Sequence, residues 1–122
     1  MAQLQHPQQL PDRITINSLD GITLLPITEI IYLEAAGTYT IFYLKNRDKI
    51  VSSLNLKEYE ELLSDHHFFR VHNSFLINLL EVKKFVKSNG GSVMMSNGNQ
   101  VSVSKRRRDE FLKLLGIKKS GN

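Results

Sequence analysis

Hydrophobic and polar residues alternate with a period of two along much of the chain, which is the pattern of β-strands that bury one face. Residues 13–17 alternate first, and residues 22–25 follow them after the turn signal Asp20-Gly21. Residues 39–44 form the longest such stretch, and their β-branched and aromatic side chains suit a pleated, half-buried surface. These stretches predict an early hairpin and a well-defined strand in the first half of the chain.

The remaining strands are expected to be short. They are predicted at residues 31–34, 49–51, 82–87, 92–95 and 100–103. Asn89-Gly90 and Asn97-Gly98 divide the last three into a meander. Residues 27–30 are expected to form a single helical turn or a bend, and the small residues 35–38 a loop. Because strands do not alternate with long helices, the pattern excludes a parallel α/β sheet and predicts an antiparallel, β-rich fold of about seven to nine short strands.

Two helices are predicted. Asn55 can cap the first, and Glu58 completes a capping-box-like pattern, so this helix should end soon after Leu63. Its apolar stripe is expected to be Leu56, Tyr59, Leu62 and Leu63. The second helix is expected to begin at Lys105 and to stop at Gly116. Its inner face is expected to be Arg108, Phe111, Leu112 and Leu115.

Composition indicates one folded domain with terminal extensions. The chain has 122 residues, of which 41% are hydrophobic and 23% charged. Residues 1–12 are rich in glutamine and are expected to be a linker or tail, residues 13–116 the domain, and residues 117–122 a flexible tail. The chain has no cysteine, which excludes disulfides and thiolate metal sites and is consistent with the cytosol. Neither a signal peptide nor an apolar run of about 18 residues is present, so no membrane span is expected.

The net charge of +4 is unevenly placed. Residues 1–60 hold five Lys or Arg and seven Asp or Glu, whereas residues 61–122 hold eleven and five. Four consecutive cations, Lys105 to Arg108, follow Ser104 at the predicted helix start, where each opposes the helix dipole by roughly 0.3–1 kcal/mol. A bound polyanion would offset that unfavourable charge. The pattern favours an anionic partner such as nucleic acid.

Enzymatic and metal chemistry find little support. The sequence contains neither a strand–turn–helix nucleophile motif nor a phosphate-binding Gly-rich loop. His66, His67 and His72 lack metal-ligand spacing, and no cysteine or convincing carboxylate ligand stands at metal spacing nearby. We therefore expect no catalytic residue, no metal site and no cofactor.

Three polar segments are candidates for contacts with a polyanion. In the basic run, arginine can pair with guanine and every cation can hold phosphate, unless the run only serves solubility. In residues 70–74, Asn73 is of a type that pairs with adenine, but it could equally form a turn while Arg70 makes a structural ion pair. In residues 37–40, small and hydroxylated side chains would let the backbone approach a phosphate, or the segment simply joins two strands.

These segments, in this order, resemble the LytTR family of bacterial DNA-binding domains. The residues that carry the resemblance begin with 31–40 and 53–63. Its core is FFRVHNSFLIN at 68–78, close to the family pattern F-x-R-x-H-[RN]-S-[FY]-[LV]-[VI]-N. Asn97-Gly98 and residues 101–107 complete it, so that it covers roughly residues 13–115.

The resemblance implies an elongated, mainly β fold. Small antiparallel sheets with about seven to ten short strands would stack in a row, with one short mid-chain helix and a C-terminal helix. It further implies sequence-specific binding to double-stranded DNA, through loops that enter the major groove, by the output domain of a bacterial two-component response regulator. The implied base contacts are Thr40, Asn73, Lys105 and Arg106. The expected phosphate contacts are Thr38, Tyr39, Arg70, His72, Ser74, Ser104, Arg107 and Arg108.

The resemblance also implies partners and a place of action. The DNA site would consist of paired direct repeats bound by a dimer, and an N-terminal receiver domain would belong to the full-length protein. Such a regulator would be cytoplasmic, associated with the nucleoid when bound, and independent of membranes.

Two other readings of the residues remain open. One is a single-strand nucleic-acid module that stacks bases on Tyr39, Phe42 and Tyr43, although these side chains are expected to lie in the core. The other is an interaction domain whose basic patch meets an acidic protein.

Overall fold

The structure is a computed structural model that describes residues 12–18 and 20–117. The strands are β1 (Arg13–Ser18), β2 (Gly21–Pro26), β3 (Ile30–Ala36), β4 (Tyr39–Leu44), β5 (Lys49–Ser52), β6 (Phe68–His72), β7 (Phe75–Asn78), β8 (Val82–Val86), β9 (Ser92–Met95) and β10 (Gln100–Ser102). The α-helices are α1 (Leu56–Leu62) and α2 (Arg108–Leu114). Short 3-10 turns are η2 (Ile27–Glu29), η3 (Leu79–Glu81), η4 (Ser88–Gly90) and η5 (Lys105–Arg107).

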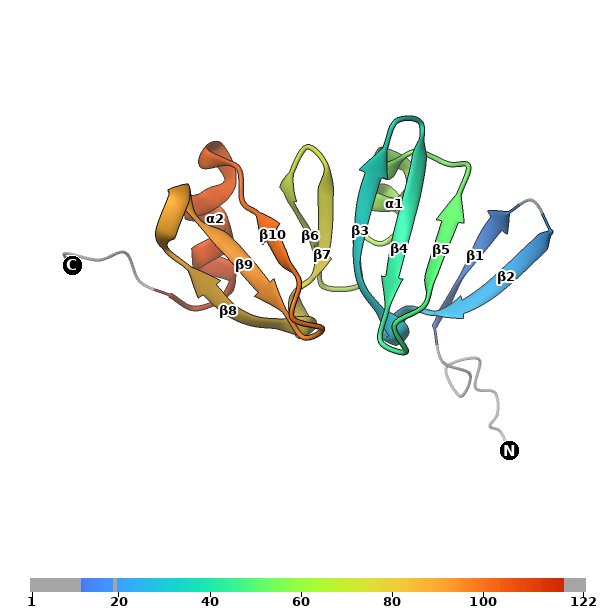
Figure 1. Cartoon of the computed structure of the whole chain (residues 1–122), viewed down its shortest axis with the longest axis horizontal. Helices are drawn as coiled ribbons and strands as arrows, with labels where there is room; N and C mark the ends of the chain where they lie inside the picture. The colour runs from blue at the N-terminus through green and yellow to red at the C-terminus, as the bar shows by residue number, and fades with distance from the viewer. Residues whose placement is uncertain (1–11, 19, 118–122) are drawn as a thin grey trace.

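Three antiparallel sheets lie in a row along the long axis of the molecule (Figure 1). The hairpin β1–β2 stands at one end, the sheet β5-β4-β3-β7-β6 in the middle, and the sheet β10-β9-β8 at the other end. The predicted fold class, mainly β with a mid-chain helix and a C-terminal helix, is confirmed. The expected linker at residues 1–12 and tail at 117–122 lie outside the described residues, except for Asp12 and Ile117.

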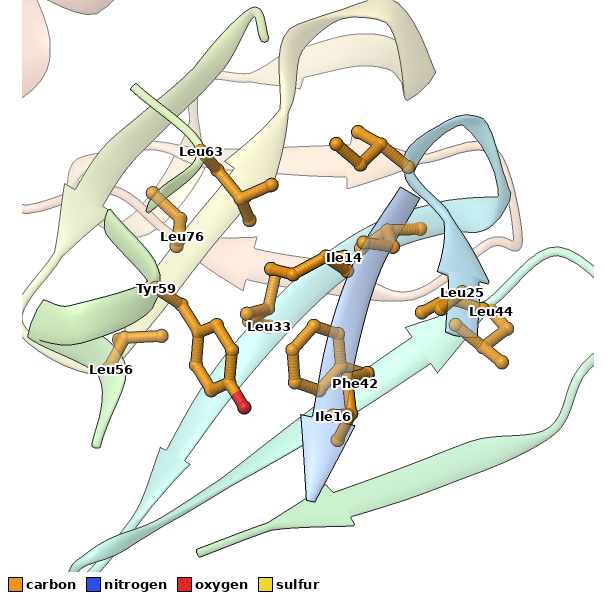
Figure 2. Packing of buried hydrophobic residues seen from close by; sticks show 12 residues of the cluster. Ile14, Ile16, Leu25, Leu33, Phe42, Leu44, Leu56, Tyr59, Leu63 and Leu76 are labelled. Carbon is orange, nitrogen blue, oxygen red and sulfur yellow. The ribbon is translucent and has the colours of Figure 1, made fainter. Parts of the chain in front are cut away.

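The middle sheet is shared by two hydrophobic cores, because successive side chains of a strand point to opposite faces. One face packs with the β1–β2 hairpin and α1 around residues such as Leu33, Phe42 and Tyr59 (Figure 2). The Phe42 and Tyr59 rings meet edge to face, with centroids 4.8 Å apart. The opposite face packs on the last sheet and α2, where Phe69 stacks on Phe111 with centroids 5.9 Å apart. The middle sheet therefore holds both ends of the molecule together.

Helix α1 begins as predicted but buries a different face. The Asn55 side chain accepts a hydrogen bond from the Glu58 amide, which confirms the expected cap. Leu56, Tyr59 and Leu63 are buried, whereas Leu62 is 58% exposed. The expectation that Leu62 belongs to the apolar stripe is therefore wrong, because α1 rests on the sheet with a narrower face than its leucines suggest.

Other differences concern element boundaries. Ala35 and Ala36 continue β3 rather than forming a loop, so only Gly37 and Thr38 make the turn to β4. Residues 68–78 form a hairpin, β6–β7, around a turn that contains no glycine. The predicted helix start at Lys105 is a 3-10 turn, and α2 follows only from Arg108.

Candidate nucleic-acid interface

Three short connections lie along one side of the molecule, the upper side in Figure 1. They are the β3–β4 turn at Gly37-Thr38, the β6–β7 turn at Asn73-Ser74, and the 3-10 turn η5 between β10 and α2. We call them together the three-turn edge. They include or adjoin the three segments that the sequence indicated as candidates for polyanion contacts, although these segments lie far apart along the chain.

Hydrogen bonds join the three turns through their backbones. The Ala35 amide, beside the β3–β4 turn, donates to the Ser74 carbonyl at 2.8 Å. The Ser104 amide, just before η5, donates to the Val71 carbonyl at 2.7 Å. Because these bonds link main chain to main chain, they connect each turn directly to its neighbour.

The β6–β7 turn is further held by side chains of β6. Arg70 donates from Nε to the His72 carbonyl at 3.0 Å and from Nη2 to the Asn73 carbonyl at 2.6 Å. Its Nη1 reaches the Glu60 carboxylate of α1 at 2.7 Å. His72 Nδ1 accepts from the Ser74 amide at 3.0 Å, so the proton of the neutral ring lies on Nε2. The turn is therefore braced on both its carbonyl and its amide sides.

Five of the predicted contact residues present exposed side chains. They are Thr38, Tyr39, Asn73, Lys105 and Arg106. Asn73 and Arg106, on adjoining turns, are both exposed, as a surface that contacts one ligand requires. His72 and Ser74 are half-buried beside them. These seven residues supply amide, hydroxyl, imidazole and cationic groups along one edge.

Two predicted contacts are buried, and we correct them. Thr40 is fully buried, and its hydroxyl donates to the Leu54 carbonyl at 2.8 Å, so it does not present a group to a base. The Ser104 hydroxyl is also buried, has no hydrogen-bond partner among the described residues, and makes no capping bond to η5. The pleat of β4 explains the first case, because Thr40 points to the α1 side while Tyr39 points outward.

The two last arginines of the basic run are directed into the protein. Arg107 donates from Nη1 to the Arg70 carbonyl at 3.0 Å. Arg108 donates from Nη2 to the Gly90 carbonyl, and its buried Nε has no acceptor among the described residues. Both side chains are half-buried, so their contribution to the edge is partly structural.

The helix dipole presents less of a conflict than the sequence suggested. Lys105 to Arg107 lie in the 3-10 turn before α2, and the first turn of α2 contains Asp109 and Glu110. Acidic residues at this position complement the dipole. Three of the four cations therefore precede the helix, and Arg108 alone occupies its first turn.

The aromatic residues of β4 do not form a platform for stacking bases. Phe42 is buried in the first core. Tyr43 stacks on Tyr32 with centroids 4.4 Å apart, and its hydroxyl donates to Glu34 at 2.6 Å. The expectation that all three aromatics lie in the core is wrong for Tyr39, which is 54% exposed. One exposed ring on β4 is too little for the single-strand binding mode considered above.

Glu60 is the residue of this region that sequence reasoning missed. It lies on α1, ten residues before Arg70, and its carboxylate meets a guanidinium on a strand. An ion pair between a helix and a strand has no fixed spacing, so the sequence carried no signal that would identify this partner.

Two general properties of the described residues complete the site. Within 12–18 and 20–117, no group of three or more His, Cys, Asp or Glu side chains could hold a metal ion. No helix in the same part of the chain is long and apolar enough to cross a membrane.

The chain matches the model of one protein family over most of its length. The model of the LytTr DNA-binding domain matches residues 20–116. The chain therefore belongs to the LytTR family of DNA-binding domains, and the resemblance noted from the sequence is confirmed.

The chain is also similar to bacterial regulators. The chain is 29% identical over 109 residues to the transcriptional regulatory protein YpdB of Escherichia coli K12, and equally to that of Shigella flexneri. The matches cover 87% of this chain and 44% of YpdB, so the chain spans less than half the length of these relatives. The solved LytTr DNA-binding domain of a putative methyl-accepting/DNA response regulator from Bacillus cereus is 30% identical, with a TM-score of 0.74. This match covers 86% of this chain and 97% of that one.

Proposed function

We propose that this chain binds double-stranded DNA sequence-specifically, as the output domain of a bacterial transcriptional response regulator. One observation carries the proposal. Asn73, Lys105 and Arg106 are all exposed, and they lie on adjacent turns whose backbones are hydrogen-bonded to each other. A rigid edge with polar groups at two or more points can enter a groove without a recognition helix. Family membership supports DNA as the ligand.

Each group in the proposal has a chemical role. Asn73 would pair with an adenine edge, while one of Lys105 and Arg106 would read guanine and the other would hold phosphate. Thr38, Tyr39, Ser74 and the Nε2–H of His72 would donate to the DNA backbone. The half-buried Arg107 and Arg108 would add positive potential more than direct contacts. Thr40 and the hydroxyl of Ser104 have no place in this scheme because both are buried.

The wider setting belongs to the same proposal. A receiver domain would precede the Gln-rich residues, and two copies would occupy paired direct repeats. The protein would act in the bacterial cytoplasm, at the nucleoid. The share of YpdB that this chain covers is compatible with an additional domain in the whole protein.

The experiment that tests the function begins with duplexes selected from a random pool by the wild-type chain. Asn73→Ala should lower the ratio of affinities for the selected and a scrambled duplex by about 1–3 kcal/mol, roughly 5- to 150-fold, while binding to the scrambled duplex hardly changes. Mobility-shift titration measures both affinities. The matched control is Asn46→Ala, in the exposed turn at the other end of β4.

The outcomes separate the possible functions. An unchanged ratio in Asn73→Ala, or failure to select any duplex, would contradict the proposal. Stronger binding to single strands than to duplexes would favour the stacking mode. Salt-sensitive binding to an acidic protein, without binding to duplexes, would favour an interaction domain.

A further inference from the structure

We propose that Glu60 and Arg70 form a positioning pair that sets the Asn73 turn and η5 in the geometry needed to read bases. The inference rests on the proposed function and deepens it. It assigns to Arg70 a role different from the phosphate contact that the sequence suggested, and it assigns a role to Glu60, which lies on α1 outside the three-turn edge.

The guanidinium of Arg70 is held from three directions. Nη1 binds the Glu60 carboxylate at 2.7 Å, while Nε and Nη2 bind the carbonyls of His72 and Asn73 at 3.0 and 2.6 Å. The group is planar, so three acceptors on its three nitrogens fix its position and its orientation. The Arg70 side chain is only 16% exposed, and Glu60 39%. The pair is therefore partly shielded from water, which strengthens its hydrogen bonds.

The turn that carries Asn73 is tied to an element outside its hairpin. The pairing of β6 with β7 shifts register between Arg70 and His72, directly before the turn. Arg70 binds the two carbonyls that lead into the turn, and Glu60 ties Arg70 to α1, which packs on the middle sheet. The position of the exposed Asn73 side chain thus depends on an anchor on α1.

The same residue reaches the second base-reading turn. The Arg70 carbonyl accepts a hydrogen bond from Arg107 at 3.0 Å, and the next carbonyl, of Val71, accepts one from the Ser104 amide. A movement of β6 at Arg70 would therefore shift η5, with Lys105 and Arg106, together with the Asn73 turn. Displacements of about 1 Å are enough to weaken a bidentate contact with a base.

A simple charge effect of Glu60 and a positioning role of Glu60 predict different results when the residue is removed. If the only effect of Glu60 is its negative charge near the edge, its removal should strengthen binding to every duplex, since DNA is a polyanion. If Glu60 anchors Arg70, its removal should weaken discrimination between duplexes. Glu61 provides the matched control, because it is the next residue of α1, is exposed, and has no side-chain partner among the described residues.

The experiment compares Glu60→Ala with Glu61→Ala on the selected and scrambled duplexes. We expect Glu60→Ala to lower the affinity ratio at least about tenfold and Glu61→Ala to leave the ratio unchanged. Arg70→Lys keeps the charge but cannot bind three acceptors in a plane, so it should lose discrimination while keeping the salt dependence of wild type. Equal ratios for the two glutamate variants, or wild-type discrimination in Arg70→Lys, would overturn the positioning role.

A double-mutant cycle with Asn73→Ala separates this inference from the proposed function. If Glu60 acts through Asn73, Glu60→Ala should lower the ratio much less in the Asn73→Ala background. If Asn73→Ala itself has no effect, the proposed function fails. If Asn73→Ala relaxes specificity while Glu60→Ala behaves like Glu61→Ala, only the positioning role fails. Thermal unfolding of each variant shows whether the domain remains folded, and Arg70→Lys decides the matter should Glu60→Ala not fold.

Discussion

The side chains of the four consecutive cations in the basic run, Lys105 to Arg108, have different surroundings. Lys105 and Arg106 are exposed, whereas Arg107 and Arg108 are half-buried and donate to the carbonyls of Arg70 and Gly90. A cation in water can contribute to ligand binding. A cation that donates to a backbone carbonyl also contributes to the stability of the fold. Counting cations in the sequence therefore overstates the number that can contact a ligand.

This difference can be tested with Arg106→Ala and Arg108→Ala. We expect Arg106→Ala to reduce affinity for the selected duplex and to flatten the slope of log K against log salt by about one unit, with stability nearly unchanged. Arg108→Ala should lower the free energy of unfolding by about 1 kcal/mol, because the Gly90 carbonyl loses its donor. Urea denaturation and salt titrations measure the two effects. Loss of stability in Arg106→Ala alone would contradict the distinction.

At the scale of elements, the sequence pattern of α1 predicts where the helix begins but not which face is buried. The cap at Asn55 is local and was predicted from four residues. The buried face was not, because Leu62 and Leu63 are adjacent leucines and only the sheet beneath α1 determines which one faces it. The turn between β6 and β7 likewise depends on another element, since Arg70 of β6 binds the Asn73 carbonyl and is itself held by Glu60 of α1.

The two leucines offer a matched test of this packing. Leu63→Ala should lower the free energy of unfolding by about 2–5 kcal/mol, since it opens a cavity in the first core. Leu62→Ala should change it by less than about 0.5 kcal/mol, because the side chain is already largely in water. Chemical denaturation of both variants decides between the faces, and a larger loss for Leu62→Ala would contradict the arrangement.

At the scale of the whole molecule, tyrosines lie on both sides of the middle sheet. Burial raises the pKa of Tyr43, and the hydrogen bond to Glu34 and its negative charge raise the pKa further. Burial also raises the pKa of Tyr32, against a smaller opposing effect of its hydrogen bond with Asn99. Burial raises the pKa of Tyr59 in the first core, where the Ser52 hydrogen bond opposes it. Both cores thus favour the protonated ring.

The raised pKa values predict loss of stability at alkaline pH. Tyrosine in the unfolded chain ionises near pH 10, so the folded state binds more protons above that pH, and stability present below about pH 10 falls as the pH rises. Each such tyrosine should add about 1.4 kcal/mol per pH unit to the decline. Tyr43→Phe should therefore show a shallower decline than wild type in urea denaturation between about pH 9 and 11.5. Equal declines would contradict the assignment.

Much of the architecture could be predicted because its causes are local. Alternation located most strands, Asp20-Gly21 and Asn97-Gly98 located turns, and the Asn55 cap located α1. The family also followed from the sequence, since the FFRVHNSFLIN segment and its neighbours occur in a fixed order. These properties depend on residues within one element or one turn.

Tertiary structure alone decided which polar residues of the three-turn edge reach solvent. Thr40 looked like a contact residue but is buried and donates to the Leu54 carbonyl, while Asn73 and Arg106 remain exposed on neighbouring turns. Arg70 looked like a phosphate ligand but donates to Glu60 and to two carbonyls of its own hairpin. Burial and hydrogen-bond partners are set by chain segments that meet only after folding, so the sequence determined the elements and the family, and packing determined the surface they present.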